Sequence, residues 1–362
     1  MLTTKSLFLR RAERYYFRPM DGDFYKSHLE RVSRSFSFCI AQLDGDFRNW
    51  VSLSYLLCRI LDTVEDANWA KPEQQAEAYL RFQEFLDRSV PPARVKAWIE
   101  SFPAGISEGE RLLIVDAGGA FERFHALPQS IQAMMRSSIL NMYRGMNYFS
   151  RERKEGSAIR LRDLPDVNQY CFFVAGVVGD LLTNLLAGAS GKAVDPSHLL
   201  DGHHFGLFLQ KVNLLKDQAE DEKQGRHLVV PSREALLASV KANAEGAIRY
   251  LTAIPVKERG YRIFCAWSLF LGLSSLRWME RSTFFGHVFM NKPPRIFTKW
   301  KLKRVKDRID DNEALVEFFR QCLPAFPAVN EPGLEKKELA STSLQAYQGP
   351  LEGSQFRALG MI

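Results

Sequence analysis

The chain has 362 residues, of which 46% are hydrophobic and 25% are charged, and its formal net charge is +7. This composition is typical of a globular protein with a large core, and it excludes a disordered or collagen-like chain. The moderate positive charge favours an anionic partner, such as a phosphate ester, a nucleic acid or a lipid headgroup.

Helical periodicity dominates the chain, and alternating strand patterns are scarce. The sequence predicts helices over residues 48–66, 75–87, 109–124, 131–149, 205–222, 233–252 and 262–281. Prolines mark the breaks between them. We therefore expect an all-α protein with one helical domain over residues 21–327. An N-terminal arm (1–20) precedes this domain, and a mobile tail (328–362) that is poor in large apolar residues follows it.

The cysteines and the apolar segments bear on the compartment. The five cysteines form no C-x-x-C pair, so we expect buried free thiols in a reducing, cytoplasmic environment. The N-terminal stretch lacks the long apolar run and cleavage site of a signal peptide. Residues 170–189 are apolar but include Asp180, which is costly in lipid, so a buried helix is expected there.

Two short acidic clusters share the layout D-x-x-E-D. The first contains Asp62, Glu65 and Asp66, and the second contains Asp217, Glu220 and Asp221. Each lies at the end of an apolar stretch, just after a cationic side chain (Arg59 or Lys216). At helical spacing the three carboxylates of a cluster share one side of the helix, where like charges repel each other. Either cluster alone could be an ordinary solvated face, but the matched pair favours a shared function.

Divalent cations are the simplest way to compensate two such clusters in an apolar bundle. Burying unpaired carboxylates costs several kcal/mol for each ion. Mg²⁺ is usually held by one or two carboxylates together with substrate phosphates. The clusters therefore predict a diphosphate site in which Mg²⁺ bridges protein and substrate. Nearby hydroxyl and guanidinium groups suit phosphate oxygens, and they belong to Ser33, Arg34, Ser35, Arg59 and Arg226.

Several longer motifs resemble the squalene/phytoene synthase family, in that family's order. They are Ser33-Arg34-Ser35-Phe36, the stretch RILDTVED that ends at Asp66, the stretch YCFFVAGVVG that begins at Tyr170, and LQKVNLLKD with Glu220, Asp221, Gly225 and Arg226. The resemblance covers roughly residues 25–310. It implies an isoprenoid-synthase-type helical bundle with a central cavity.

The resemblance also implies roles for individual residues. The six acidic residues named above would bind Mg²⁺, and the five hydroxyl and guanidinium residues would bind diphosphate. Tyr170 would be the catalytic phenol near the reacting carbons. Phe36 and Phe264 would stabilise carbocations by cation–π contact, although each such ring taken alone is more often plain core. The family usually has arginine at the position of Lys216, and lysine keeps the charge but loses the bidentate fork.

Three features favour the squalene synthases within this family. Phe264-Cys265-Ala266 resembles one of their segments, and Asn213 and Lys216 fall where those enzymes place polar groups that face NADPH. The basic run 299–306 resembles their segment near the cofactor phosphates, with Lys301 and Lys303 as the expected contacts. A solvated face or a membrane-surface patch would explain this run equally well.

The resemblance implies a head-to-head condensation of two farnesyl diphosphates to presqualene diphosphate, followed by NADPH-dependent reduction to squalene. Three alternatives remain. The enzyme could make phytoene or dehydrosqualene, it could stop at presqualene diphosphate, or the chain could be a non-catalytic scaffold. The last conflicts with six costly carboxylates. We expect Mg²⁺ and NADPH as cofactors, a cytoplasmic protein with peripheral contact to a membrane surface, and no nucleic-acid partner.

Overall fold

The computed structural model describes residues 22–152, 154–155, 158–191, 194–223, 233–284 and 295–325. The predicted arm and tail, residues 1–20 and 328–362, lie outside the described residues. The chain divides into two compact units, one comprising Met1–Ile40 and Gly45–Tyr143 and the other Ala41–Asp44 and Arg144–Ile362. The single domain over residues 21–327 stays a prediction, whereas the all-α class is confirmed.

The first unit is built around one long apolar helix. Its elements are α2 (Gly22–Val32), α3 (Arg34–Ile40), α4 (Gly45–Asp66), α5 (Pro72–Asp87), α6 (Pro92–Ser101), α7 (Glu108–Val115), α8 (Ala117–His125) and the start of α9 (Gln129–Glu152). Helix α4 contacts α2, α3, α5, α7 and α8, and its leucines are fully buried. An apolar helix that is surrounded in this way delivers its acidic C-terminal turn to a defined place within the unit.

The predicted helix over residues 109–124 is wrong in one respect, because the structure has two helices there. The backbone of Asp116, between α7 and α8, departs from helical geometry with φ −95° and ψ 11°. Its carboxylate lies 3.0 Å from Nε2 of the buried His28 on α2. Gly118 and Gly119 follow. Glycine has the lowest helix propensity of any residue except proline. A tertiary contact therefore interrupts a pattern that looks continuous in the sequence.

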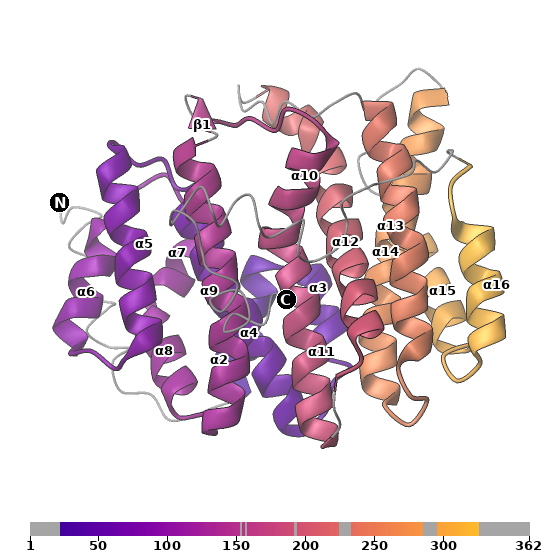
Figure 1. The fold of residues 1–362 in the computed structure, drawn as a ribbon, viewed down its shortest axis with the longest axis horizontal. Coiled ribbons are helices and arrows are strands. Elements are labelled where there is room, and N and C mark those ends of the chain that lie inside the picture. The colour runs from indigo at the N-terminus through magenta and orange to yellow at the C-terminus, as the bar shows by residue number, and fades with distance from the viewer. Residues whose placement is uncertain are drawn as a thin grey trace. The chain divides into compact units, whose positions relative to one another are not determined.

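The second unit contains the remaining elements. They are the end of α9, β1 (Lys154–Glu155), β2 (Ala158–Ile159), α10 (Leu164–Cys171), the π-helical turn η1 (Phe172–Gly176), α11 (Val177–Ser190), α12 (Pro196–Lys223), α13 (Arg233–Ala253), α14 (Arg259–Phe284), α15 (Arg295–Lys306) and α16 (Asn312–Cys322). Strands β1 and β2 form a small antiparallel pair with Lys154 opposite Ile159. Helices α12, α13 and α14 pack side by side (Figure 1).

Glycines allow α12 to approach the η1–α11 segment closely. A Cβ atom on Gly179 would collide with the carbonyl oxygen of Gly202, and one on Gly206 would collide with the carbonyl oxygen of Ala175. Neither obstacle is a movable side chain, so the helix backbones themselves set the separation. Gly179, a glycine of the motif that begins at Tyr170, therefore has a packing role.

Among the residues that the structure describes, one run of helix, Leu164–Ser190, is long and apolar enough to cross a membrane, and 67% of its most apolar window is buried in the protein. This burial agrees with the prediction of a core helix. Asp180 in this run accepts a 2.6 Å hydrogen bond from His203, and both side chains are buried. The five cysteines are free and buried, as predicted.

Candidate active site

The last turns of α4 carry the first acidic cluster. Asp62 is half-buried and Asp66 is exposed, whereas Glu65 is only 8% exposed. Among the described residues, no three His, Cys, Asp or Glu side chains come together closely enough to hold a metal ion. Metal binding by the first cluster therefore stays a prediction.

Arg59 lies between two carboxylates in the first unit. Its Nη1 lies 3.5 Å from Oδ2 of Asp62, one turn further along α4, and its Nη2 donates a 2.5 Å hydrogen bond to Oε1 of Glu110 on α7. Burial by itself lowers the pKa of Arg59, but the charges of Asp62 and Glu110 more than reverse this and raise it. The guanidinium is thus a permanent cation beside the cluster.

Burial raises the pKa of Asp62 to about 7, and Arg59 opposes this rise while Asp66 adds to it. The carboxyl of Asp62 is therefore poorly compensated in the absence of a further cation. Such a group gains from a bound divalent ion, because the ion replaces the water that burial removes.

The predicted phosphate-binding stretch lies at the start of α3. Arg34 and Ser35 are exposed there, and Ser33 is half-buried. The Ser33 hydroxyl accepts a hydrogen bond from the backbone N–H of Phe36. It also forms a hydrogen bond with the hydroxyl of Tyr55. Burial raises the pKa of Tyr55. The Phe36 ring lies 5.4 Å from the Tyr55 ring, centroid to centroid. Ser33 and Phe36 are thus connected through Tyr55 to α4.

Tyr170 lies in the last turn of α10, one residue before Cys171, where the helix ends and the π-helical turn begins. Its side chain is 7% exposed and packs edge-on against Phe149. Single π-turns within helices are rare and often occur at functional sites. The local geometry is therefore consistent with the special role that the sequence predicts for Tyr170, and it leaves that role a prediction.

The structure brings two of the predicted cofactor residues together. Nζ of Lys216 donates a 3.0 Å hydrogen bond to Oδ1 of Asn213, one turn earlier on α12. Both side chains are half-buried. Phe264 on α14 is buried and stacks on Tyr261. The pair of Asn213 and Lys216 presents an amide and a cation on one helix face, which suits a phosphorylated ligand.

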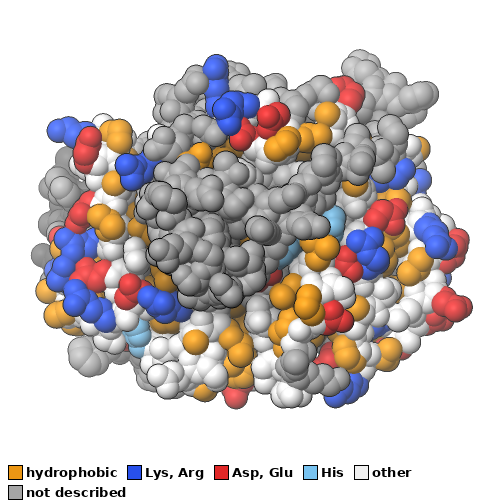
Figure 2. All heavy atoms as spheres, viewed as in Figure 1, with side chains coloured by type: hydrophobic (Ala, Val, Ile, Leu, Met, Phe, Trp, Pro, Cys, Tyr) orange, Lys and Arg blue, Asp and Glu red, His pale blue; other side chains and the backbone are white. Residues whose placement is uncertain are grey.

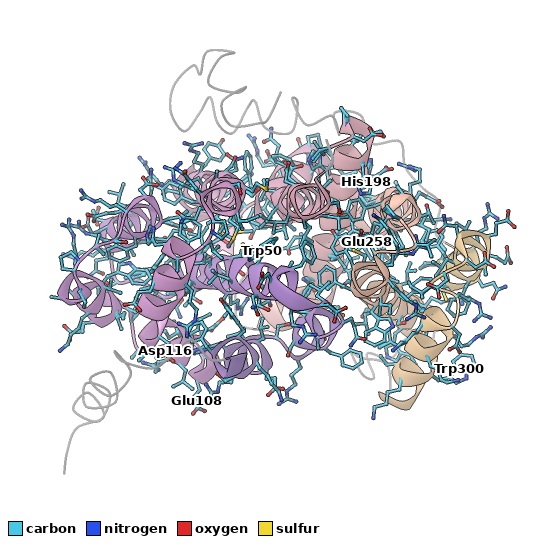
Figure 3. All side chains as sticks on the ribbon, turned by 90° about the horizontal axis from the view of Figure 1, so that it is seen from below. Trp50, Glu108, Asp116, His198, Glu258 and Trp300 are labelled. Carbon is cyan, nitrogen blue, oxygen red and sulfur yellow. The ribbon has the colours of Figure 1, made fainter. Side chains whose placement is uncertain are left out.

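The basic helix α15 has one packed side and one charged side. Leu302 and Val305 are buried, whereas Lys303 is exposed and pairs with Asp307 at 3.6 Å. Lys301 is half-buried. Trp300 is 56% exposed and lies at the outer edge of the ribbon (Figure 3). Elsewhere on the face drawn in Figure 2, acidic and basic side chains of the described residues are interspersed.

The other predicted site residues belong to the second acidic cluster and its surroundings. The side chains of Asp217, Glu220 and Asp221 lie outside the described residues, as does Arg226, although α12 extends to Lys223. The two acidic clusters belong to different compact units. Their opposition across a shared cavity stays a prediction.

The side chains of the first cluster offer the type of ligand atom that Mg²⁺ prefers. Asp62 and Asp66 offer hard carboxylate oxygens one turn apart, and burial raises the pKa of Asp62, so its charged form would gain from a bound cation. Two carboxylates are also what Mg²⁺ commonly takes from a protein when phosphates complete its shell. The cations and the amide on α12 and α15 likewise fit the phosphates of NADPH by charge.

The prediction from sequence missed two residues beside the first cluster, Tyr55 and Glu110. Glu110 had a local signal, because Ser107 and Glu110 form a capping box at the start of α7. That signal predicts a helix start but no contact with Arg59. It also missed the buried Lys211, whose Nζ bonds Ser239 and Asn243.

Comparisons with known proteins identify relatives over much of the chain. The family described as "Squalene/phytoene synthase" matches residues 29–245. "Squalene synthase" of Eremothecium gossypii is 34% identical over 204 residues, which are 55% of this chain and 43% of that protein. "Squalene synthase 1" of Arabidopsis thaliana is 30% identical over 198 residues, 44% of its length. The matched region spans less than half the length of these curated relatives.

Solved structures show the same fold at low sequence identity. A structure of TcSQS with the ligand BPH1237 has a TM-score of 0.66 at 22% identity, covering 91% of this chain and all of that one. A dehydrosqualene synthase in complex with a ligand has a TM-score of 0.53 at 18% identity, covering 83% of this chain and 99% of that one. These structures support the isoprenoid-synthase-type helical fold.

Proposed function

The chain belongs to the squalene/phytoene synthase family, and from this premise we propose that it makes squalene from two molecules of farnesyl diphosphate. In the first step one farnesyl diphosphate loses its diphosphate, the alkene of the other attacks the allylic cation, and loss of a proton closes a cyclopropane. In the second step presqualene diphosphate loses its diphosphate, rearranges and takes up a hydride. The observation that carries this proposal is the pairing of a cation with a poorly compensated carboxyl at Arg59 and Asp62.

The residues of the chain take distinct parts in this proposal. Ser33, Arg34, Ser35, Arg59 and Arg226 bind phosphate oxygens, and the guanidinium groups do so through paired N–H donors. The phenol of Tyr170 acts near the reacting carbons. Phe36 and Phe264 offer ring faces to the carbocations, because the electron-rich face of an aromatic ring attracts positive charge.

Two cofactors complete the proposed site. Asp62, Glu65 and Asp66, with Asp217, Glu220 and Asp221, would hold Mg²⁺, which supplies Lewis-acid stabilisation to the departing diphosphate when bound. Asn213, Lys216, Lys301 and Lys303 would bind NADPH, which supplies the hydride. The carboxylates orient the substrate headgroup, and the lysines offer point charges to the cofactor phosphates.

Product identity tests the proposed reaction. Purified protein incubated with farnesyl diphosphate, Mg²⁺ and NADPH is expected to yield squalene, detected by gas chromatography with mass spectrometry. Without NADPH the reaction should stop at presqualene diphosphate or divert to other products, because no hydride is available. A profile that does not change on omission of NADPH would contradict the reductive step.

A second candidate is dehydrosqualene or phytoene synthesis without reduction. One observation favours it: Lys303, a predicted cofactor contact, is 78% exposed at its side chain and pairs with Asp307, just past the end of α15. An exposed ion pair of this kind is not a built phosphate site. The same incubation distinguishes the two candidates, since this one yields its hydrocarbon whether or not NADPH is present.

We also propose that α15 touches an anionic membrane surface, which suits a cytoplasmic enzyme with an apolar product. The exposed Trp300 lies beside cations, with the guanidinium of Arg304 4.8 Å from the centre of its ring. Lys299 and Lys303 are exposed on the same helix. Tryptophan with lysine and arginine is the usual composition of an interfacial helix.

Replacement of Trp300 by alanine should weaken vesicle binding by up to roughly 70-fold, because burying half of this ring removes on the order of 100 Å² from water, which is worth about 2.5 kcal/mol. Co-flotation with vesicles rich in phosphatidylserine at low salt measures the effect, and added salt should release the wild-type protein. Val256→Ala alters another exposed apolar side chain of the second unit and serves as the control. Equal flotation of both variants and the wild type would exclude α15 as the contact.

A further inference from the structure

Glu110 is held rigidly beside Arg59. Its Oε1 accepts the 2.5 Å hydrogen bond from Arg59. Its Oε2 accepts two more, from the Ser107 hydroxyl at 2.7 Å and the Ser107 backbone N–H at 3.2 Å. The Glu110 side chain is 15% exposed. Because both oxygens are engaged, this carboxylate has little rotational freedom.

Close packing of α7 on α2 fixes where Glu110 stands. A Cβ atom on Gly109 would lie 2.8 Å from the carbonyl oxygen of Arg31 at the end of α2, so only glycine permits this approach. Helix α7 also packs against α4. The capping box of α7 thus brings a carboxylate to the acidic turn of α4 from a separate element.

Arg59 is shared unequally between its two carboxylates. The contact with Glu110 at 2.5 Å is a short charge-assisted hydrogen bond, whereas the contact with Asp62 at 3.5 Å is at the limit of one. Without the Glu110 charge, Asp62 would be the nearest anion to Arg59 among the described contacts. An aspartate fully paired with arginine is a poor ligand for a cation, because the guanidinium already binds the carboxylate oxygens and neutralises their charge.

We infer that Glu110 is a positioning residue that holds Arg59 away from Asp62 and so keeps the Asp62 carboxylate available to a divalent cation. The inference rests on the proposed function, because it takes Asp62 as a metal ligand. It adds a seventh acidic residue that lies outside both D-x-x-E-D clusters. Glu110 acts through Arg59 and needs no contact with the metal.

Binding of Mn²⁺ alone to the purified protein tests this role without substrate. Free Mn²⁺ is counted by electron paramagnetic resonance, and Mn²⁺ takes the same oxygen ligands as Mg²⁺. Glu110→Gln should weaken Mn²⁺ binding roughly tenfold, the usual scale for the loss of a group that orients a metal ligand. Glutamine can replace glutamate in a capping box, so α7 keeps its start.

Glu108→Gln is the matched control. It removes the same charge from the same turn of α7, and Glu108, which is labelled in Figure 3, is exposed. Its Mn²⁺ binding should equal that of the wild type. Equal weakening in both variants would mean that Glu110 contributes only general negative charge, and the positioning role would be rejected.

The Arg59→Gln background separates positioning from direct attraction. With no guanidinium to hold, Glu110→Gln should change Mn²⁺ binding by less than about twofold in this background. A further tenfold loss there would overturn the inference, as would a wild-type protein that binds no Mn²⁺. Wild-type protein that binds Mn²⁺ but makes no squalene would refute the proposed function, whereas unaltered binding in Glu110→Gln would refute only the role of Glu110.

Discussion

Replacement of Asp62 by asparagine is expected to lower kcat by roughly 100- to 1000-fold while the protein stays folded. A metal ligand that stabilises departing diphosphate contributes several kcal/mol to the transition state, and each 1.4 kcal/mol corresponds to tenfold in rate. Asparagine keeps the size of the side chain but offers a weaker, neutral oxygen. Steady-state turnover of farnesyl diphosphate at saturating Mg²⁺ measures the loss. Asp217→Asn should have the same consequence, because the second cluster has the same layout.

The free energy of unfolding of Asp62→Asn is the control that shows whether the variant stays folded. The direction in which this free energy changes with pH can be predicted for the wild type. Burial raises the pKa of Asp62 from an ordinary value of 3.8 to about 7 in the folded protein. Between these values the folded state holds a proton that the unfolded state releases, so the free energy of unfolding falls as pH rises through this window. Asparagine cannot titrate and should remove this part of the slope.

Chemical denaturation in EDTA at pH 5 and pH 8 checks this expectation. The wild type should lose more stability than Asp62→Asn between the two values, and the variant should be at least as stable at pH 8. A variant that unfolds more easily at pH 8 would show that Asp62 is a structural residue. Wild-type turnover in the variant would remove Asp62 from the site.

Replacement of Gly179 by alanine is expected to destabilise the protein by about 3 kcal/mol or more, although it adds a single methyl group. The new Cβ would collide with the backbone carbonyl of Gly202 on α12. Overpacking usually costs about 1–3 kcal/mol, and here no side-chain rotation can relieve it. Helices α11 and α12 must separate, and the contact of Gly206 with Ala175 would open as well. Thermal denaturation should show a midpoint lowered by several degrees.

Gly118→Ala is the matched substitution in the first unit. A Cβ atom there would lie 3.7 Å from Val95, which is ordinary van der Waals contact, and Gly118 lies within α8. Alanine stabilises an open helical position by roughly 0.5–1 kcal/mol relative to glycine. The melting temperature of the Gly118→Ala variant should therefore equal or exceed that of the wild type. If both variants melted alike, close backbone packing would not be the reason for Gly179.

The two substitutions separate the two kinds of information in the family motifs. Asp62 is a proposed metal ligand, so its motif would reflect chemistry and its replacement should affect the rate. Gly179 belongs to the motif that begins at Tyr170 because of packing, and its replacement should affect stability. The sequence alone does not distinguish these two reasons, since both residues are simply members of sequence motifs. The contacts that each residue makes in the structure do distinguish them.

The sequence by itself determined the helical class, most helix positions and the acidic turn of α4, because these follow from periodicity, prolines and charge spacing along a single segment. Tertiary structure decided the rest. It split residues 109–124 at Asp116, turned Glu65 inward and brought Glu110 to Arg59 across 51 positions of the chain. Local patterns cannot specify such contacts, because they depend on how closely separate helices pack, and that in turn depends on residues such as Gly109 that carry no side chain.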